Sequence, residues 1–189
     1  MSKARRGVFR SAILAMLFPV VAIAQDFGHP PLFSANGISG NTFGAHFCMQ
    51  EIVASGPDAL VSRAARDCIG TEVTTCGSFP DTCAGLEQAY WDWRIARTYE
   101  GLQAWVADSD DVDPAVVQSV SNPTAATANV PLECQLRVTG GQGGEADPEA
   151  LAICMMRETA LIALELEFAV RQACETATGG TFAAYCGRE

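Results

Sequence analysis

Eight cysteines are the side chains whose type and number most directly suggest chemistry in this chain. They are Cys48, Cys68, Cys76, Cys83, Cys134, Cys154, Cys174 and Cys186. An even number of cysteines in an exported chain is typical of a disulfide framework. A structural zinc site requires cysteine pairs roughly two to four residues apart, with histidine support. Here the closest pair lies seven residues apart and the chain holds two histidines, so we expect disulfides and no metal ligands.

Nucleophilic catalysis and phosphate chemistry find little support in the residues. A serine or cysteine hydrolase needs a base beside its nucleophile, but both histidines, His29 and His46, lie early in the chain. His46 stands close to Cys48, which we expect to be oxidised. No glycine-rich phosphate loop follows a predicted strand, and no pair of carboxylates stands out among the 22 acidic residues. We predict no catalytic residues and no cofactor, and an enzyme is the less favoured interpretation.

Residues 1–24 have the features of a signal peptide. Lys3, Arg5, Arg6 and Arg10 form a positive segment, which the apolar run "SAILAMLFPVVA" follows. Small residues at positions 22 and 24 predict cleavage before Gln25. The apolar run is shorter than the roughly 20 residues that a spanning helix needs, so we expect no membrane insertion after cleavage. The mature protein is expected in the periplasm or secreted, and "ARRGVFR" leaves Sec and twin-arginine export both open.

The mature chain is strongly acidic. All 22 acidic residues lie after residue 24. Only eight of the basic residues do, and all eight are arginines, so the mature chain has a net charge of 8 − 22 = −14. Such a surface repels nucleic acid and anionic lipid and favours a cationic partner. The alternative is that the acidic residues serve only to keep an exported protein soluble and bind no partner.

Helical patterns dominate the chain after residue 44. Residues 25–44 lack periodicity and are predicted to be a flexible N-terminal arm, and residues 45–189 a helical domain. Helices are expected from 45, from 58 to a cap at Gly70, from 81 or 82 to about 107, briefly from 114, and from 148 to about 178. Segments 70–82, 108–114 and 139–147 are predicted loops, and residues 132–138 at most a helical turn. The fold class is all-α: a small disulfide-linked helical bundle with a long buried C-terminal helix.

The C-terminal helix carries the clearest boundary signals. Asp147 is the expected N-cap and Pro148 the first helical residue. Apolar residues cover more than half of its circumference, which predicts the most buried helix. Glu167, Arg171 and Glu175 follow one another at four-residue steps and are expected to mark its solvated edge.

Aromatic residues gather in "CAGLEQAYWDWRIARTYEGLQAW", residues 83–105. Trp91, Ile95, Thr98, Leu102 and Trp105 recur at helical spacing, which is typical of a buried stripe. Trp93 lies about 200° from Trp91 on an ideal helix, so one of the two is expected near the surface. A small-ligand carrier that uses these rings is a further alternative.

The same region resembles the N-terminal domain of the LprI-type lysozyme inhibitors of bacterial envelopes. The similarity spans roughly residues 68–168 and includes "CIGTEVTTC", Cys83 and the "GGQGG" loop between two cysteines. The positions that match the family's motif are Glu87, Tyr90, Trp91, Asp92, Tyr99, Leu102 and Thr159. The chain departs from the family at "ATANVPLEC", where an aromatic segment with Arg-Asp is usual. This departure favours an alternative: a structural or stress-related envelope protein without inhibitory activity.

The resemblance, together with spacing, suggests a set of disulfides among the 105 connectivities that eight cysteines allow. The preferred pairs are Cys134–Cys154, Cys76–Cys83, Cys48–Cys68 and Cys174–Cys186. Each pair joins cysteines across a turn or loop, and Cys76 and Cys83 could instead pair with distant partners.

A lysozyme-inhibitor type implies binding of lysozyme or another basic cell-wall hydrolase. The acidic loops would then meet basic residues at the enzyme's substrate cleft. The candidate partner-binding residues are Asp108, Asp110, Asp111 and Asp113 on one loop, and Glu145 and Asp147 on the other. Asp92, between two tryptophans, is expected to pair with an arginine such as Arg137 or Arg157 and to orient the bundle. The sequence indicates neither the oligomeric state nor a specific target hydrolase.

Overall fold

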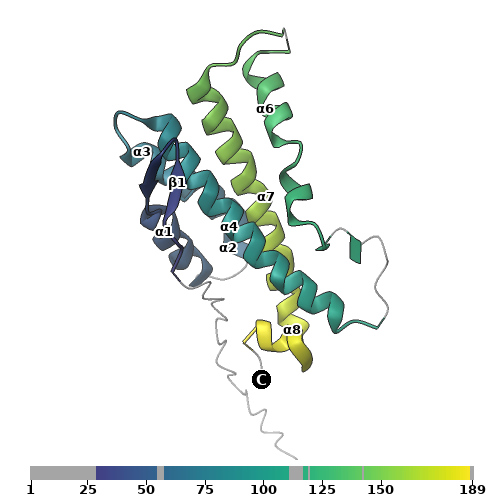
Figure 1. Cartoon of the computed structure of the whole chain (residues 1–189). Helices are drawn as coiled ribbons and strands as arrows, with labels where there is room; N and C mark the ends of the chain where they lie inside the picture. Colours follow the sequence, from purple (N-terminus) through teal and green to yellow (C-terminus); the bar gives the residue numbers. More distant parts are fainter. Residues whose placement is uncertain (1–28, 55–57, 111–116, 119, 142, 188–189) are drawn as a thin grey trace, which may run out of the picture.

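A computed structural model of the chain describes residues 29–54, 58–110, 117–118, 120–141 and 143–187, and the side chains of 58–60 are left out. The predicted signal peptide, most of the short helix expected from residue 114, and Asp111 and Asp113 therefore lie outside the described residues. The predicted all-α class is confirmed: the described chain is helical apart from one small hairpin. Two long helices, α4 (Pro80–Ala107) and α7 (Pro148–Thr176), lie side by side at the centre and run in the same direction (Figure 1).

Helix α4 begins one or two residues before the predicted caps, with Pro80 at its first position and Asp81 in its first turn. Its apolar stripe faces the core: Trp91 is fully buried and Ile95 nearly so, whereas Leu102 is partly exposed. Trp93, on the other side, is also partly exposed. The expectation that Trp91 and Trp93 diverge is confirmed, and the aromatic segment serves mainly as core.

Helix α7 is the predicted long C-terminal helix with a buried face. It is not the most buried helix, since eleven residues of α4 are buried against eight of α7. The Asp147 side chain accepts a hydrogen bond from the backbone N–H of Ala150 at 3.0 Å, which confirms the predicted N-cap. Its inner face contributes Met156, Ala160, Ala163, Leu164 and Val170 to the core. The helix ends at Thr176, a little before the predicted stop. A turn then leads into α8 (Gly180–Tyr185), which packs across the ends of the long helices.

Part of the predicted flexible arm is ordered. Strands β1 (Phe33–Ala35) and β2 (Ile38–Gly40) form an antiparallel hairpin in which Phe33 pairs with Gly40. Its two-residue turn is Asn36-Gly37, both with positive φ, which is the geometry that this dipeptide favours. The hairpin packs on α4, where the Phe33 ring meets the Tyr90 ring edge-on at 6.5 Å. The prediction of a flexible arm is therefore wrong for residues 33–40, which form this hairpin.

Three short helices precede α4, namely α1 (Phe43–Ala54), α2 (Asp58–Asp67) and α3 (Thr71–Thr75). Helix α3 replaces the first part of the predicted 70–82 loop. Gly70 has a φ of 86° and joins α2 to α3, so it serves both as the stop we predicted and as the residue before the next helix. The sequence signal for α3 was weak because five residues are too few to show a helical period.

The segment between the long helices is also more helical than predicted. It forms the 3-10 turn η1 (Pro123–Thr127) and helix α6 (Val130–Val138). Helix α6 contains the whole segment expected to be at most one helical turn. It packs along α7 and joins it through the glycine-rich loop at the upper end of the molecule (Figure 1). No helix in the described part of the chain has both the length and the apolar character to cross a bilayer.

All eight cysteines are paired, and the four preferred disulfides are confirmed. They are Cys48–Cys68, Cys76–Cys83, Cys134–Cys154 and Cys174–Cys186. Each joins neighbouring elements: α1 to the end of α2, α3 to α4, α6 to α7, and α7 to α8. Because such a framework forms and persists under oxidising conditions, the protein belongs in an oxidising compartment.

A close approach at Gly101 fixes α8 against α4. A Cβ atom at Gly101 would lie 2.2 Å from the Tyr185 ring. The Tyr185 hydroxyl donates a hydrogen bond to the carbonyl of Arg97 at 3.1 Å, and burial, with Glu167 nearby, raises the pKa of Tyr185 to about 12. The hydroxyl therefore keeps its proton over the whole physiological range.

We expect Gly101→Ala to lower the free energy of unfolding by about 1–3 kcal/mol, because overpacking outweighs the gain in helix propensity. In a Tyr185→Ala background, the same change should become neutral or stabilising. Gly144→Ala is the control, since a Cβ there meets nothing within 4 Å. Urea denaturation of the four variants measures these differences, and equal losses at Gly101 with and without the Tyr185 ring would contradict the packing explanation.

Candidate functional site

A buried ion network joins the two long helices. Glu167, with no exposed surface, accepts hydrogen bonds from the Arg94 guanidinium, at 3.1 Å from Nε, and from Arg171, at 2.9 and 2.7 Å. Burial raises the pKa of Glu167, but the two guanidiniums outweigh it and lower the pKa below its ordinary value. The prediction that Glu167 marks a solvated edge of α7 is therefore wrong, because its main partner lies on another helix.

Glu87, the first residue of the family-like motif, is a buried capping group. Its carboxylate accepts hydrogen bonds from the backbone N–H groups of Gly70 at 2.6 Å and Glu72 at 3.0 Å, and from the Trp91 indole at 3.2 Å. These contacts tie the start of α3 to the middle of α4. Burial raises the pKa of Glu87, although the three N–H donors act to lower it. The side chain therefore organises the fold and does not face a partner.

The other family-like positions are divided between the interior and the surface. Tyr90 and Thr159 are fully buried, Tyr99 is nearly so, and Leu102 is partly buried. The Tyr90 hydroxyl accepts a hydrogen bond from Arg94 at 2.8 Å and so extends the buried network. Six of the seven motif residues, Glu87 and Trp91 included, thus pack within the bundle, and of these six only Leu102 is more than slightly exposed.

Asp92 is the exception. Its side chain is exposed, and burial of its carboxyl on one side raises the pKa. Neither predicted partner pairs with it among the described residues: Arg137 forms an ion pair with Glu158, and no ion pair links Asp92 to Arg157. The predicted ion pair of Asp92 with Arg137 or Arg157 is therefore wrong, and the side chain is exposed instead.

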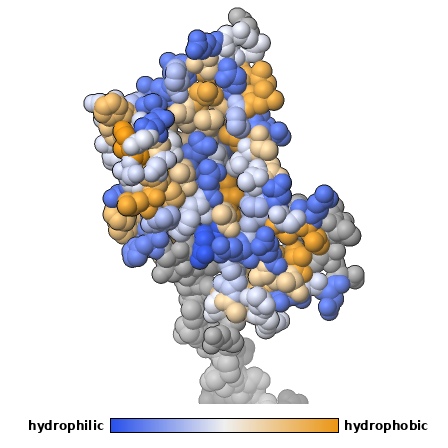
Figure 2. Space-filling model, viewed as in Figure 1, coloured by the Kyte–Doolittle hydropathy of each residue, from blue (hydrophilic) through white to orange (hydrophobic). Residues whose placement is uncertain are grey.

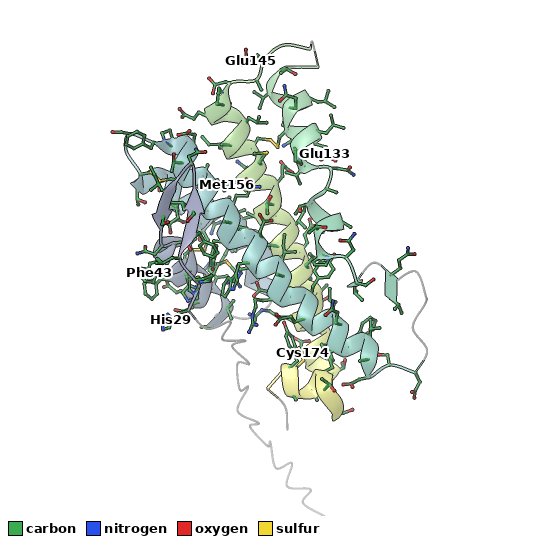
Figure 3. All side chains as sticks on the ribbon, viewed as in Figure 1. His29, Phe43, Glu133, Glu145, Met156 and Cys174 are labelled. Carbon is green, nitrogen blue, oxygen red and sulfur yellow. A yellow bond between two sulfur atoms is a disulfide. The ribbon has the colours of Figure 1, made fainter. Side chains whose placement is uncertain are left out.

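The candidate partner-binding acids lie at opposite ends of the molecule. Asp108 and Asp110 follow α4 near α8, whereas Glu145 and Asp147 precede α7 at the other end (Figure 3, where Glu145 and Cys174 mark the two ends). Asp108 accepts a hydrogen bond from the backbone N–H of Phe182 and so holds α8. The two loops therefore cannot form one continuous surface.

The α6–α7 hairpin carries exposed acidic and apolar side chains, on α6 and on the segment that leads into α7. Leu132 is 62% exposed and Leu136 53%, one helical turn apart on α6, and an apolar patch lies over this helix in Figure 2. Glu133, on the same helix, is also exposed (Figure 3). We call this set the hairpin-tip surface; its members are Leu132, Leu136, Glu133, Glu145, Asp147 and Glu149. The two leucines were not predicted as site residues, although two apolar residues four positions apart in a largely polar segment could have indicated an exposed apolar stripe on a helix.

Most arginines in the described part of the chain form an ion pair with an acidic side chain of the chain itself. Arg63 and Arg66 lie beside Asp67, Arg97 beside Glu100, and Arg137 beside Glu158. In contrast, none of the carboxylates of the hairpin-tip surface has an ion-pair partner among the described residues. The hairpin-tip surface therefore carries two exposed leucines together with carboxylates that no arginine among the described residues compensates.

No protein-family model, curated protein or solved structure matches the chain. Within the residues that the structure describes, His, Cys, Asp and Glu side chains nowhere gather in threes or more as a metal site would require.

Proposed function

We propose that this is an exported binding protein of the lysozyme-inhibitor type, which binds a basic cell-wall hydrolase through its hairpin-tip surface. The observation that carries the proposal is the pair of exposed leucines, Leu132 and Leu136, on a hairpin whose exposed carboxylates Glu133, Glu145, Asp147 and Glu149 have no ion-pair partner among the described residues. Exposed apolar side chains with a charged rim are typical of protein interaction sites. A cationic protein fits this rim best, because its lysines and arginines find carboxylates that no internal arginine already occupies.

The proposed mechanism separates encounter from retention. The net charge of −14 on the mature chain attracts a basic enzyme over a distance set by ionic strength. Desolvation of Leu132 and Leu136 against the enzyme then supplies most of the retained affinity. The Cys134–Cys154 disulfide holds α6 on α7 next to this surface, so little ordering remains for the binding step. The protein binds and covers the hydrolase and catalyses no reaction itself.

A bacterial periplasm, or the medium outside the cell, is the proposed location. Four disulfides support an oxidising compartment, and the predicted signal peptide supports export. The LprI-type resemblance supports the envelope, and the buried positions of Glu87, Tyr90 and Trp91 agree with a motif that maintains this fold.

The test is inhibition of a basic lysozyme in a cell-wall turbidity assay. Purified mature protein should inhibit at low salt, and inhibition should weaken severalfold between about 50 and 200 mM salt as the charges are screened. Leu132→Ser/Leu136→Ser should weaken inhibition about tenfold or more, as expected for a desolvated centre. The matched apolar control is Leu32→Ser, which directly precedes β1, outside the hairpin-tip surface, and is 75% exposed.

The charge contribution has its own control pair. Glu145→Gln/Glu149→Gln should weaken inhibition more than Asp92→Asn/Glu165→Gln, which removes the same charge from exposed positions outside the surface. Equal effects would show attraction by net charge alone and would contradict the hairpin-tip surface as the binding site.

A structural or stress-related envelope protein is the second candidate. It is favoured by the departure at "ATANVPLEC", which the structure builds as the end of η1 and the start of α6. This candidate predicts no inhibition of any lysozyme type while all four disulfides remain intact by mass spectrometry.

A further inference from the structure

A pocket at the α8 end of the molecule has features of a binding site. Its volume is about 350 Å³, and its walls come from the ends of α4 and α7 and from the turn before α8. It lies at the opposite end of the molecule from the hairpin-tip surface. Its lining residues include Trp105, Asp108, Ser109, Thr176, Ala177 and Phe182.

Several sources of negative potential converge on this pocket. Because α4 and α7 run in the same direction, both of their C-terminal ends reach it, and the C-terminal end of a helix carries partial negative charge. Neither helix has a basic residue in its last turn to offset that charge. Asp108 adds a full carboxylate, and among the described residues that line the pocket there is no lysine, arginine or histidine.

The pocket also offers an aromatic surface. Trp105 is partly buried and lines the wall, so part of the indole remains accessible, and Phe182 lies beneath at 5% exposure. An indole next to a carboxylate suits a cation with an apolar stem, because the charge gains from both the ring face and the carboxylate. The Asp108 carboxylate and the two helix C-terminal ends disfavour an anionic ligand here.

The pocket is held in shape by the fold. The Cys174–Cys186 disulfide joins α7 to the end of α8. Asp108 accepts the N–H of Phe182 and leaves its second carboxylate oxygen without a hydrogen bond among the described residues. Gly180, with a φ of 77°, allows this contact, since a Cβ there would lie 2.5 Å from the Asp108 carboxylate. The carboxylate is thus positioned before any ligand arrives.

We infer that this pocket binds an organic cation, a guanidinium or alkylammonium group whose stem lies on Trp105 and whose charge meets Asp108. The cation can come from a free amine or from a lysine or arginine side chain of a partner. This inference does not rest on the proposed function, because the pocket lies away from the hairpin-tip surface and can be tested without a hydrolase.

The test is a titration with Nα-acetyl-arginine amide, followed by the indole N–H signal of Trp105 in NMR spectra, assigned with Trp105→Phe. Nα-acetyl-citrulline amide is the neutral control of nearly the same shape and should not shift the signal. Asp108→Asn should weaken arginine-amide binding about tenfold, the value of one charge-assisted contact. Asp110→Asn, which removes the same charge just outside the pocket, should leave it unchanged.

Ala177→Leu provides a second variant that fills the pocket without altering charge, and it should abolish the shift while the circular dichroism spectrum stays helical. A basic lysozyme then distinguishes the two sources. If Asp108→Asn also weakens lysozyme binding, the pocket takes a partner's side chain; if it does not, the pocket takes a free amine. Equal binding of the arginine and citrulline probes, or no dependence on Asp108, would overturn the inference.

Discussion

Glu167→Gln should lower the free energy of unfolding by about 3–5 kcal/mol, the cost of leaving buried charge without its partner. Arg94 is 3% exposed and Arg171 10%, and both donate to this one carboxylate. The neutral amide cannot balance two guanidiniums that solvent hardly reaches. Urea denaturation at pH 7 measures the change. The control is Glu158→Gln, which breaks the more exposed pair with Arg137 and should cost less than about 1 kcal/mol.

The same network can be replaced instead of broken. Arg94→Met/Glu167→Leu removes the central pair together and should recover much of the stability lost by Glu167→Gln, because apolar residues of similar volume often substitute well for a buried ion pair. Arg171, at the edge of the network, can then turn towards solvent. A double variant no more stable than Glu167→Gln would show that the pair does more than satisfy its own charges.

The pH dependence follows from the direction of the Glu167 shift. Its pKa is lowered in the folded protein, so its contribution to stability is fully present above the pKa of an unfolded glutamate, about 4.3. That contribution is lost as pH falls through the lower, folded value. The difference in stability between the wild type and Glu167→Gln should therefore be constant from neutral pH to about 5 and shrink in more acidic solution.

Local signals in the sequence predicted the parts of the fold that local physics determines. Asp147 and Pro148 predicted the start of α7, and the spacing of the aromatic residues predicted the buried face of α4. The four disulfides matched the set that the family resemblance and the cysteine spacing together suggested, although spacing alone left Cys76 and Cys83 open to distant partners. The Asn36-Gly37 turn was an equally local signal for the hairpin, but the glycine, proline and asparagine around it suggested a loose arm instead.

Non-local contacts explain the predictions that failed. Glu167, Arg171 and Glu175 have the spacing of a solvated helix edge. Nothing in the sequence near them indicates that Glu167 is buried and accepts a hydrogen bond from Arg94, which lies 73 residues away. Asp108 looked like a free loop carboxylate because its partner, the N–H of Phe182, is 74 residues distant. The pocket between them depends on two helices ending at the same place, which no single segment reveals.

Glu87→Ala should lower the free energy of unfolding by about 3 kcal/mol or more. The change leaves three N–H groups without their acceptor, two of them on the backbone at the start of α3 and one on Trp91, and each buried donor left unsatisfied costs about 1–3 kcal/mol. Glu87→Gln should cost less, because the amide oxygen can still accept from some of these donors. Asp92→Ala, an exposed residue of the same motif, should change stability by less than about 0.5 kcal/mol.

This comparison also separates the two roles that the family-like motif can have. If Glu87 maintains the fold, Glu87→Ala at a temperature where it remains folded should inhibit lysozyme as well as the wild type does, despite its lower stability. If the motif contacts the partner, inhibition should fall in Glu87→Ala at full folding, or in Asp92→Ala without any loss of stability. The structure favours the first outcome, because Glu87 has no exposed surface and a partner can reach it only after α3 has left α4.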